Sequence, residues 1–108
     1  MKKIPAFLII LASSSLNAAT WFTGSIDRVY PLANGNFVII FKEDSPACTS
    51  INASKYHYVN SGNNGLTPEG LDKIYSLALT AATTGKKLSI NFDETESACY
   101  VNRAYISF

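Results

Sequence analysis

The strongest structural signal in the sequence is the stretch from Thr67 to Phe92, which contains a helix with both ends marked. Thr67 suits the N-cap position, because its hydroxyl can accept a hydrogen bond from a free amide of the first turn, and Pro68 suits the first helical position. Gly85 can take the left-handed conformation that ends a helix. Apolar residues between these ends recur at helical spacing and predict one buried face: Leu71, Ile74, Tyr75, Ala78 and Ala82.

The opposite face of this helix carries small and mostly uncharged side chains, among them Ser76, Thr80 and Thr83. A fully solvated helix face is usually richer in charge. Small residues also allow a second helix or subunit to approach closely. If the protein forms a ring of identical subunits, we therefore expect these three residues to contribute to the oligomer contact.

The N-terminal segment has the pattern of a secretory signal peptide. A short basic start with Lys2 and Lys3 precedes the apolar run 4–11, and small residues fill 12–19. The apolar run is too short for a membrane span, which needs about 20 residues. The sequence predicts a signal peptide over 1–19, a single small domain over 20–108, and export to the periplasm or the medium.

Removal of the leader changes the charge balance. The nine basic residues of the chain lose Lys2 and Lys3, so seven remain against eight acidic residues. No basic surplus is left to attract nucleic acid, and no lysine- or arginine-rich helix indicates binding to a membrane surface. We therefore expect no nucleic-acid partner and no membrane-spanning segment.

Two cysteines remain in the exported domain, Cys48 and Cys99, and an even pair in an oxidising compartment predicts a disulfide. The chain-entropy model gives such a bridge about 4 kcal/mol, as an upper figure, for a loop of about 50 residues. A metal or redox pair would need other ligands or a CxxC spacing, and His57 is the only histidine. We expect no metal site.

Strands are predicted on both sides of the helix. Their expected ranges are 21–30, 37–41, 56–59, 87–92 and 100–108. In the first, Phe22, Ile26 and Tyr30 share one face. The last presents Ala104, Ile106 and Phe108 to the core. The second is apolar throughout and should be covered on both faces.

Three strands, a helix and two further strands form the order of an OB-like five-stranded barrel. The alternative is an open antiparallel sheet with the helix packed on one face, an α+β arrangement.

The segment from Leu71 to Ile90 resembles part of the B subunits of AB5 toxins of the pertussis, subtilase and typhoid toxin type. In both, a helix with a tyrosine and small residues leads through a Thr-Gly turn, here Thr84 and Gly85, into an alternating strand. The resemblance covers about 20 residues and implies a small exported disulfide-bonded OB fold. It also implies a ring that binds cell-surface glycans, with a secreted partner subunit. The serine that binds sugar in that family has no counterpart in the first strand, so no binding residue is carried over.

No catalytic motif is present. The sequence lacks GxSxG, HExxH and a phosphate-binding loop, and spacing gives His57 no nucleophile or carboxylate partner. The acidic stretch that contains Asp93, Glu94 and Glu96 lacks the spacing of a calcium loop. We therefore expect neither an enzyme nor a cofactor.

The aromatic residues are the best indication of function. Tyrosine and tryptophan suit sugar stacking and protein interfaces, but most of the rings in this chain are assigned here to the core. Tyr56, His57 and Tyr58, together with Asn60 in the loop that follows, are predicted to form an exposed ligand-binding surface. Two functions stay open: a binding module for a glycan or protein, and a periplasmic or envelope interaction or inhibitor domain without a small ligand.

Overall fold

The computed structural model describes residues 19–49 and 54–108, which form one helix and six strands. The elements are β1 (Ala19–Gly24), β2 (Ile26–Pro31), β3 (Phe37–Phe41), β4 (Tyr56–Val59), α1 (Pro68–Thr84), β5 (Leu88–Asp93) and β6 (Val101–Tyr105). The predicted signal peptide lies outside the described residues, except for Ala19, which begins β1.

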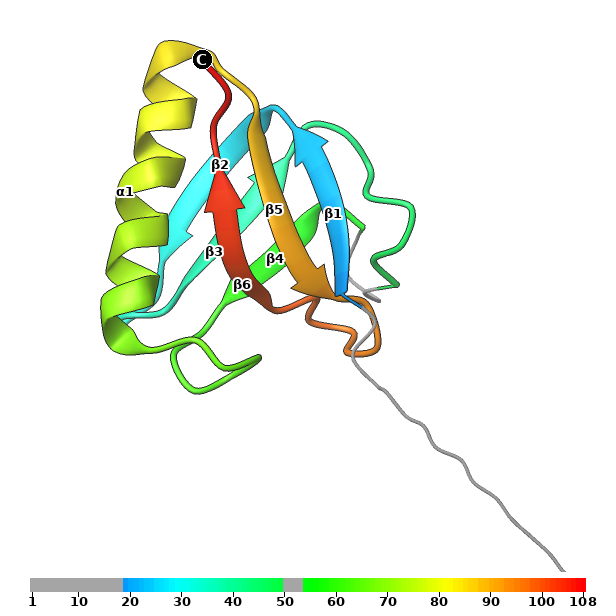
Figure 1. Ribbon diagram of the computed structural model, residues 1–108, viewed down its shortest axis with the longest axis vertical. Coiled ribbons are helices and arrows are strands. Elements are labelled where there is room, and N and C mark those ends of the chain that lie inside the picture. The colour runs from blue at the N-terminus through cyan, green and yellow to red at the C-terminus, as the bar shows by residue number, and fades with distance from the viewer. Residues whose placement is uncertain (1–18, 50–53) are drawn as a thin grey trace, which may run out of the picture.

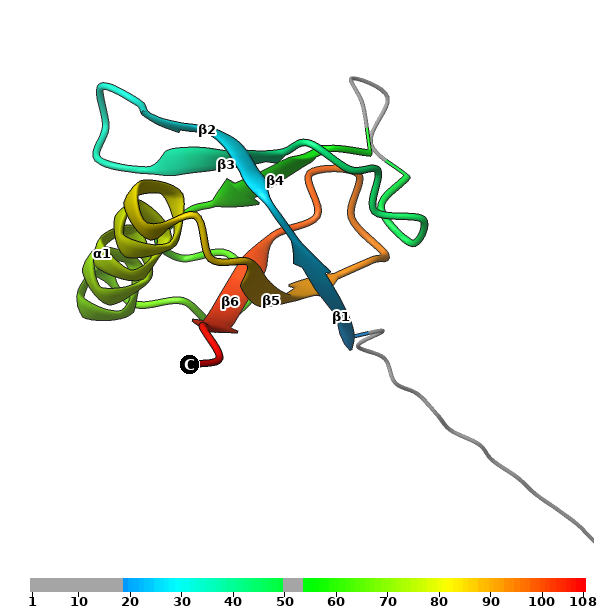
Figure 2. The ribbon, with the colours of Figure 1, turned by 90° about the horizontal axis from the view of Figure 1, so that it is seen from above.

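The strands form two antiparallel sheets of three strands each, in the orders β1-β5-β6 and β2-β3-β4 (Figure 1). The two sheets lie as layers with α1 along one side, where it contacts both β2 and β6 (Figure 2). The predicted β-rich domain with one helix is confirmed, but the two sheets do not close into the predicted five-stranded barrel. Near β6, the Tyr58 N–H of β4 donates to the carbonyl of Ala98, which lies three residues before β6, at 3.1 Å.

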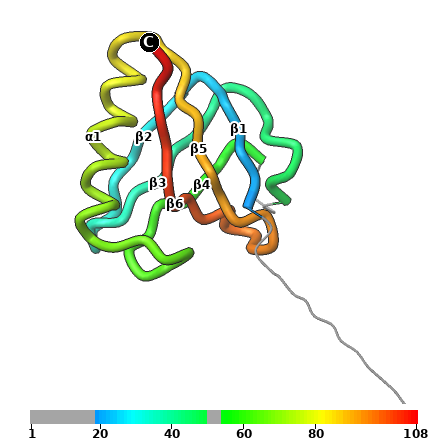
Figure 3. The backbone as a smooth tube through the Cα atoms, viewed as in Figure 1, coloured from blue at the N-terminus to red at the C-terminus, as the bar shows by residue number. Residues whose placement is uncertain are grey.

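The extra strand arises because the predicted first strand divides between the sheets. β1 pairs with β5, β2 pairs with β3, and the chain passes from one to the other at Gly24 and Ser25 (Figure 3). A Cβ atom on Gly24 would lie only 2.8 Å from both Glu43 Oε1 and the Phe22 ring, so a larger residue at this crossing would force these side chains to move. The backbone N–H of Ser25 donates to the same Glu43 carboxylate at 2.8 Å and lowers the pKa of that carboxyl.

A β-bulge changes the face of the residues that follow it. Ile26 pairs with Phe41 and Arg28 with Ile40, so Asp27 is an extra residue in β2. Side chains alternate along a strand, and one inserted residue therefore reverses the faces after it. Ile26 and Val29 pack against the core, whereas Tyr30 is exposed. The prediction that Tyr30 shares a face with Phe22 and Ile26 is wrong for this reason.

The helix follows the sequence closely. Thr67 is the N-cap and its hydroxyl accepts from the N–H of Gly70, while Gly85 ends the helix with φ of 74°. The buried residues are Leu71, Ile74, Ala78 and Ala81. Ala82, which the spacing placed on the buried face, is exposed. Ala81 takes its place because the stripe advances by three residues after Ala78.

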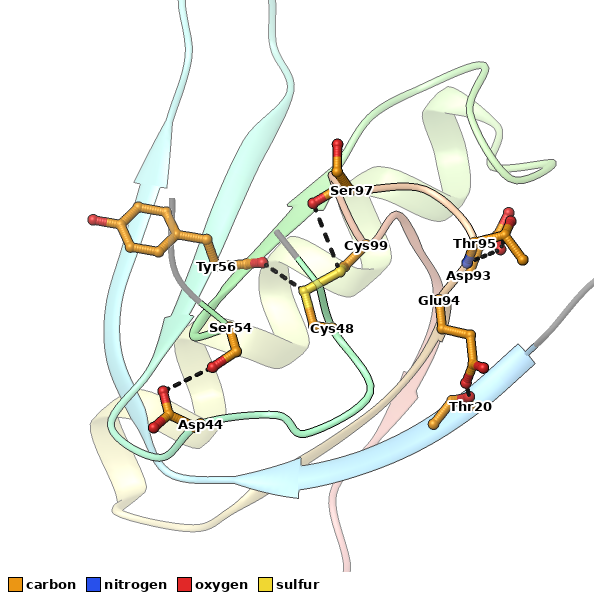
Figure 4. The surroundings of a disulfide bond; sticks show 10 residues. All are labelled: Thr20, Asp44, Cys48, Ser54, Tyr56, Asp93, Glu94, Thr95, Ser97 and Cys99. Carbon is orange, nitrogen blue, oxygen red and sulfur yellow. Dashed lines mark hydrogen bonds between the residues drawn. A yellow bond between two sulfur atoms is a disulfide. The ribbon is translucent and has the colours of Figure 1, made fainter. Parts of the chain in front are cut away.

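The predicted disulfide between Cys48 and Cys99 is confirmed, with the two Cα atoms 5.8 Å apart. It joins the loop after β3 to the segment before β6, and so links the two sheets covalently (Figure 4). Both cysteines are buried.

The C-terminal strand is shorter than expected, since β6 ends at Tyr105. Ala104 packs against the core and Ile106 is buried, as predicted. Phe108 is 92% exposed, so its assignment to the core face is wrong. Beyond the end of the strand, alternation no longer fixes its direction, and its ring instead lies 5.7 Å from the ammonium group of Lys86.

Candidate binding faces

Side chains alternate between the two faces of β4, so the residues predicted to form a ligand-binding surface do not all lie on one side of the sheet. His57 is fully buried and therefore cannot belong to an exposed surface. Its ring packs between the two sheets, with centroid distances of 4.8 Å to Phe92, 5.3 Å to Phe41 and 6.0 Å to Phe22. Side chains alternate along β4, so Tyr56 and Tyr58 point outward and His57 points into the core. The sequence-based assignment of His57 to the binding site is therefore wrong.

Burial sets the protonation state of His57. Desolvation lowers its pKa to about 4, and the backbone of Lys55 acts in the opposite direction. The Lys55 carbonyl already accepts from the N–H of Phe41, and neither ring nitrogen of His57 has a hydrogen-bond partner among the described residues. His57 is therefore uncharged at neutral pH, and its ring packs in the core as an aromatic side chain.

Tyr56 and Tyr58 lie on the outer side of sheet β2-β3-β4. Cross-strand pairing places Val38 between Tyr30 and Tyr58 in one row, and Ile40 between Arg28 and Tyr56 in another. In Figure 4 the Tyr56 ring points away from the disulfide. We call Tyr30, Val38, Ile40, Tyr56 and Tyr58 the tyrosine face.

The floor of the tyrosine face is apolar and closed. Val38 and Ile40 are 0% and 3% exposed although they lie on the outer side of the sheet, and the three tyrosines next to them are only partly exposed. The expectation that 37–41 is covered on both faces is confirmed. Asn60 follows β4 and is half-buried, and its Oδ1 lacks a hydrogen-bond partner among the described residues.

The outer side of the other sheet carries a second aromatic group that the sequence analysis did not single out. Register places Trp21, Asn91 and Arg103 in one cross-strand row, and Thr23, Ser89 and Tyr105 in the next. This side faces the viewer in Figure 1, and no helix or strand of the described residues crosses it. We call Trp21, Ser89, Asn91, Arg103 and Tyr105 the indole face.

Two rings and a guanidinium form the rim of the indole face. Trp21 and Tyr105 are 49% and 48% exposed, and their ring centroids are 5.3 Å apart with planes at 57°. The Arg103 guanidinium carbon lies 5.8 Å from the centre of the Trp21 ring, within range of a cation–π interaction. No carboxylate of residues 19–49 and 54–108 forms an ion pair with Arg103.

The floor of the indole face is polar and buried. Ser89 and Asn91 are 5% and 2% exposed, so the larger side chains around them exclude water from both. The Ser89 hydroxyl is satisfied by Thr23 Oγ1 at 2.6 Å. Asn91 Oδ1 has no hydrogen-bond partner in the described part of the chain. A buried acceptor of this kind costs about 1–3 kcal/mol while unpaired.

The proposed oligomer residues Ser76, Thr80 and Thr83 are all exposed on α1. The hydroxyls of the two threonines are used within the helix, because that of Thr80 donates to the Ser76 carbonyl at 2.9 Å and that of Thr83 to the Leu79 carbonyl at 2.9 Å. The threonine methyl groups and the 40% exposed Leu79 are left as the outer surface. A shallow depression of about 450 Å³ beside Ser76 is lined otherwise by Glu69, Asp72 and Lys73.

Residues 19–49 and 54–108 contain no group of three or more His, Cys, Asp or Glu side chains placed to hold a metal ion. In the same part of the chain, no helix combines the length and the apolar character needed to cross a bilayer.

The signal that could have located the indole face is present in the sequence. Ser89 and Asn91 alternate with the core residues of β5, a pattern that indicates a second face with polar residues. The rings that cover these residues come from strands far away in sequence, and only strand pairing shows that Trp21 and Tyr105 meet above them.

Comparisons of the chain with protein-family models, curated proteins and solved structures found no match. What the chain binds is therefore inferred from its own residues.

Proposed function

We propose that this protein is an exported, non-catalytic binding module that recognises a glycan on the indole face. The observation that carries the proposal is the pair of half-exposed rings, Trp21 and Tyr105, with the Arg103 guanidinium beside them. Aromatic rings with polar handles offer apolar area, and sugars present C–H groups on one side and hydroxyls at the edge. A ring platform with a few convergent polar groups is the usual composition of a small-ligand site.

The fold is compatible with an OB-like module as a finer description. The pairing orders β2-β3-β4 and β6-β5-β1, with β1 and β2 continuous along the chain, follow the strand neighbours of such a barrel. This order supports the resemblance to toxin B subunits, and with it a homo-oligomer whose contacts include Ser76, Thr80 and Thr83. Light scattering after size exclusion tests the assembly, since a strict monomer contradicts the ring.

Export is part of the same proposal. The formed disulfide fits an oxidising compartment, periplasmic or extracellular, and so supports the predicted signal peptide. A secreted partner subunit would follow from the toxin-like assembly and is tested by co-purification from the culture medium.

The glycan-binding proposal is tested by a glycan array with wild type and Trp21→Ala. We expect competable binding of wild type and a loss of about thirtyfold or more in Trp21→Ala, the range found for a central tryptophan contact. Tyr30→Ala on the tyrosine face is the matched control and should bind as wild type does. Equal loss in both variants, or no sugar bound by the folded wild type, contradicts the proposal.

A second candidate function is protein interaction through the tyrosine face. Its specific observation is the apolar floor of Val38 and Ile40 beside three tyrosines, because aromatic anchors around an apolar centre are typical of protein interfaces. This would suit a periplasmic or envelope interaction or inhibitor domain. Binding to a protein that Tyr56→Ala weakens and Trp21→Ala leaves unchanged would favour it.

A further inference from the structure

A cavity that the proposed function does not use lies between the β2–β3 hairpin, the loop after β4 and the first turns of α1. Its volume is about 250 Å³, and the side chains that line it include Asn34, Asn36, Ser61, Pro68, Leu71 and Asp72. Pockets for drug-sized molecules measure about 300–1,000 Å³, so this cavity suits a smaller ligand. None of its lining residues belongs to the indole face or to the tyrosine face.

Two asparagines hold the walls of this cavity in place. Asn34 Oδ1 accepts from the N–H of Asn36 at 3.1 Å within the hairpin, and Asn36 Oδ1 accepts from the N–H of Ser61 at 3.0 Å. The second bond ties the hairpin to the loop after β4. Walls that are fixed before a ligand arrives reduce the ordering cost of binding.

The same two bonds decide which polar groups are left for a ligand. Because a backbone N–H uses the oxygen of each asparagine, the Nδ2 group of each is left with two N–H donors that have no partner within 19–49 and 54–108. In the same residues, the carboxylate of Asp72 forms no ion pair. These groups are within reach of a ligand, since Asn34, Ser61 and Asp72 are exposed and Asn36 is half-buried.

We propose that this cavity binds one neutral sugar ring through two adjacent hydroxyls, of which one donates to the Asp72 carboxylate and the other accepts from an asparagine Nδ2 group. A hydroxyl can donate and accept, so a pair of them matches an acceptor and a donor in one cavity. Pro68 and Leu71 offer apolar surface to the C–H groups of the same ring. This site is additional to the indole face and does not rest on it.

Charged ligands fit the cavity less well. Asp72 lines it and Glu69 lines the depression next to it, so both carboxylates repel an anion such as a uronic acid. A cation would pair with Asp72, but it offers no acceptor to the asparagine Nδ2 groups, which can only donate. A neutral sugar satisfies the donors and the acceptor together.

The depression of about 450 Å³ beside Ser76 shares Asp72 with the cavity. A second sugar ring therefore has space next to the first. The sugar in the cavity is accordingly either a free monosaccharide or the end of a glycan, and the affinity of a disaccharide distinguishes these two sources.

The experiment titrates the folded exported protein with glucose, galactose, mannose, a disaccharide of each and glucuronate, and follows the backbone amides by NMR. We expect at least one neutral sugar to shift the amide signals of Asn36, Ser61 and Asp72. Glucuronate should bind at least tenfold more weakly, because it adds a charge beside Asp72. Tighter binding of the disaccharide than of its monosaccharide indicates the end of a glycan, and equal affinity indicates a free sugar.

Three variants test the contacts. Asp72→Asn should weaken the monosaccharide about tenfold, since a hydrogen bond to a carboxylate is stronger than one to an amide. Ser61→Leu should abolish binding by filling the cavity, while its backbone N–H still bonds to Asn36. Glu69→Gln is the matched control, because this exposed carboxylate lines only the depression, and it should bind the monosaccharide as wild type does.

The position of the shifted signals separates this site from the indole face. Shifts at Trp21 and Arg103 alone overturn this inference and support the proposed function. Shifts at Asn36, Ser61 and Asp72 alone support this inference and leave the indole face without a sugar. No shift with any neutral sugar, or equal affinity of wild type and Asp72→Asn with its fold verified by circular dichroism, overturns the inference.

Discussion

Both outer sheet faces carry aromatic side chains, but they differ in the residues that lie beneath these side chains. On the tyrosine face the rings lie beside Val38 and Ile40, which are buried and apolar. On the indole face they surround Ser89 and Asn91, which are equally buried but polar. An apolar floor is stable without a partner, whereas a polar floor with an unpaired buried acceptor destabilises the fold. The first face therefore contributes mainly to stability, and the second is better suited to a small ligand.

The largest expected effect comes from cutting the link between the sheets that carry these faces. Cys48→Ala with Cys99→Ala should lower the free energy of unfolding by about 4 kcal/mol at most, because the unfolded chain regains the entropy of a loop with a sequence separation of 51 residues. Urea denaturation measures the difference. A loss below about 1 kcal/mol would show that packing between the sheets suffices without the bridge.

The next effect concerns His57, which lies in the core between the two faces. The pKa of His57 is about 4 in the fold against an ordinary value of 6.5, so the unfolded chain binds more protons between these two pH values. The contribution of His57 to the free energy of unfolding is fully present above pH 6.5. It is lost as the pH falls toward 4, in total about 3 kcal/mol.

The stability of wild type and His57→Phe, measured across this pH range, tests the assignment. Phenylalanine keeps an aromatic ring among Phe22, Phe41 and Phe92 but cannot be protonated. The variant should therefore lack the pH-dependent component that wild type shows between pH 6.5 and 4. Identical slopes for the two proteins would place the titrating group elsewhere.

The smallest effect compares one tyrosine from each face. Tyr58→Ala uncovers Val38 and should destabilise by about 2 kcal/mol, while Tyr105→Ala removes a ring that is 48% exposed and should lose about 1 kcal/mol or less. For ligand binding the order reverses, with Tyr105→Ala the weaker binder of glycans. Thermal melts and calorimetry on the same samples give both quantities, and a similar pattern for the two variants would remove the distinction between the faces.

Local signals in the sequence were sufficient for the helix, for β4 and for the disulfide. The helix ends depend on Thr67, Pro68 and Gly85 alone, and each acts within one turn. The pairing of Cys48 with Cys99 needed no geometry, since the domain has no other cysteine. These predictions succeed because the physical cause lies within a few residues or in a simple count.

Some features depend on which of two alternating strand positions faces the core, and these could not be predicted from the sequence. The bulge at Asp27 reverses the faces of β2, and no local pattern distinguishes it from a regular strand. The assignment of His57 to the surface failed similarly, because His57 and Tyr58 are both plausible outward residues until β4 is paired with β3. The indole face required two long-range pairings, β1 with β5 and β5 with β6.

The crossing at Gly24 and Ser25 has a mechanical consequence. β1 and β2 are one continuous chain that belongs to both sheets, the chain from β4 through α1 to β5 joins the sheets again, and the Cys48–Cys99 bridge is a third covalent connection between them. A tensile force applied between a ligand on one face and a partner on the other would be carried by these three connections, rather than by side-chain packing alone. The disulfide would then add to the rupture force of the domain, and a reduced protein should yield at lower load while its ligand affinity is unchanged.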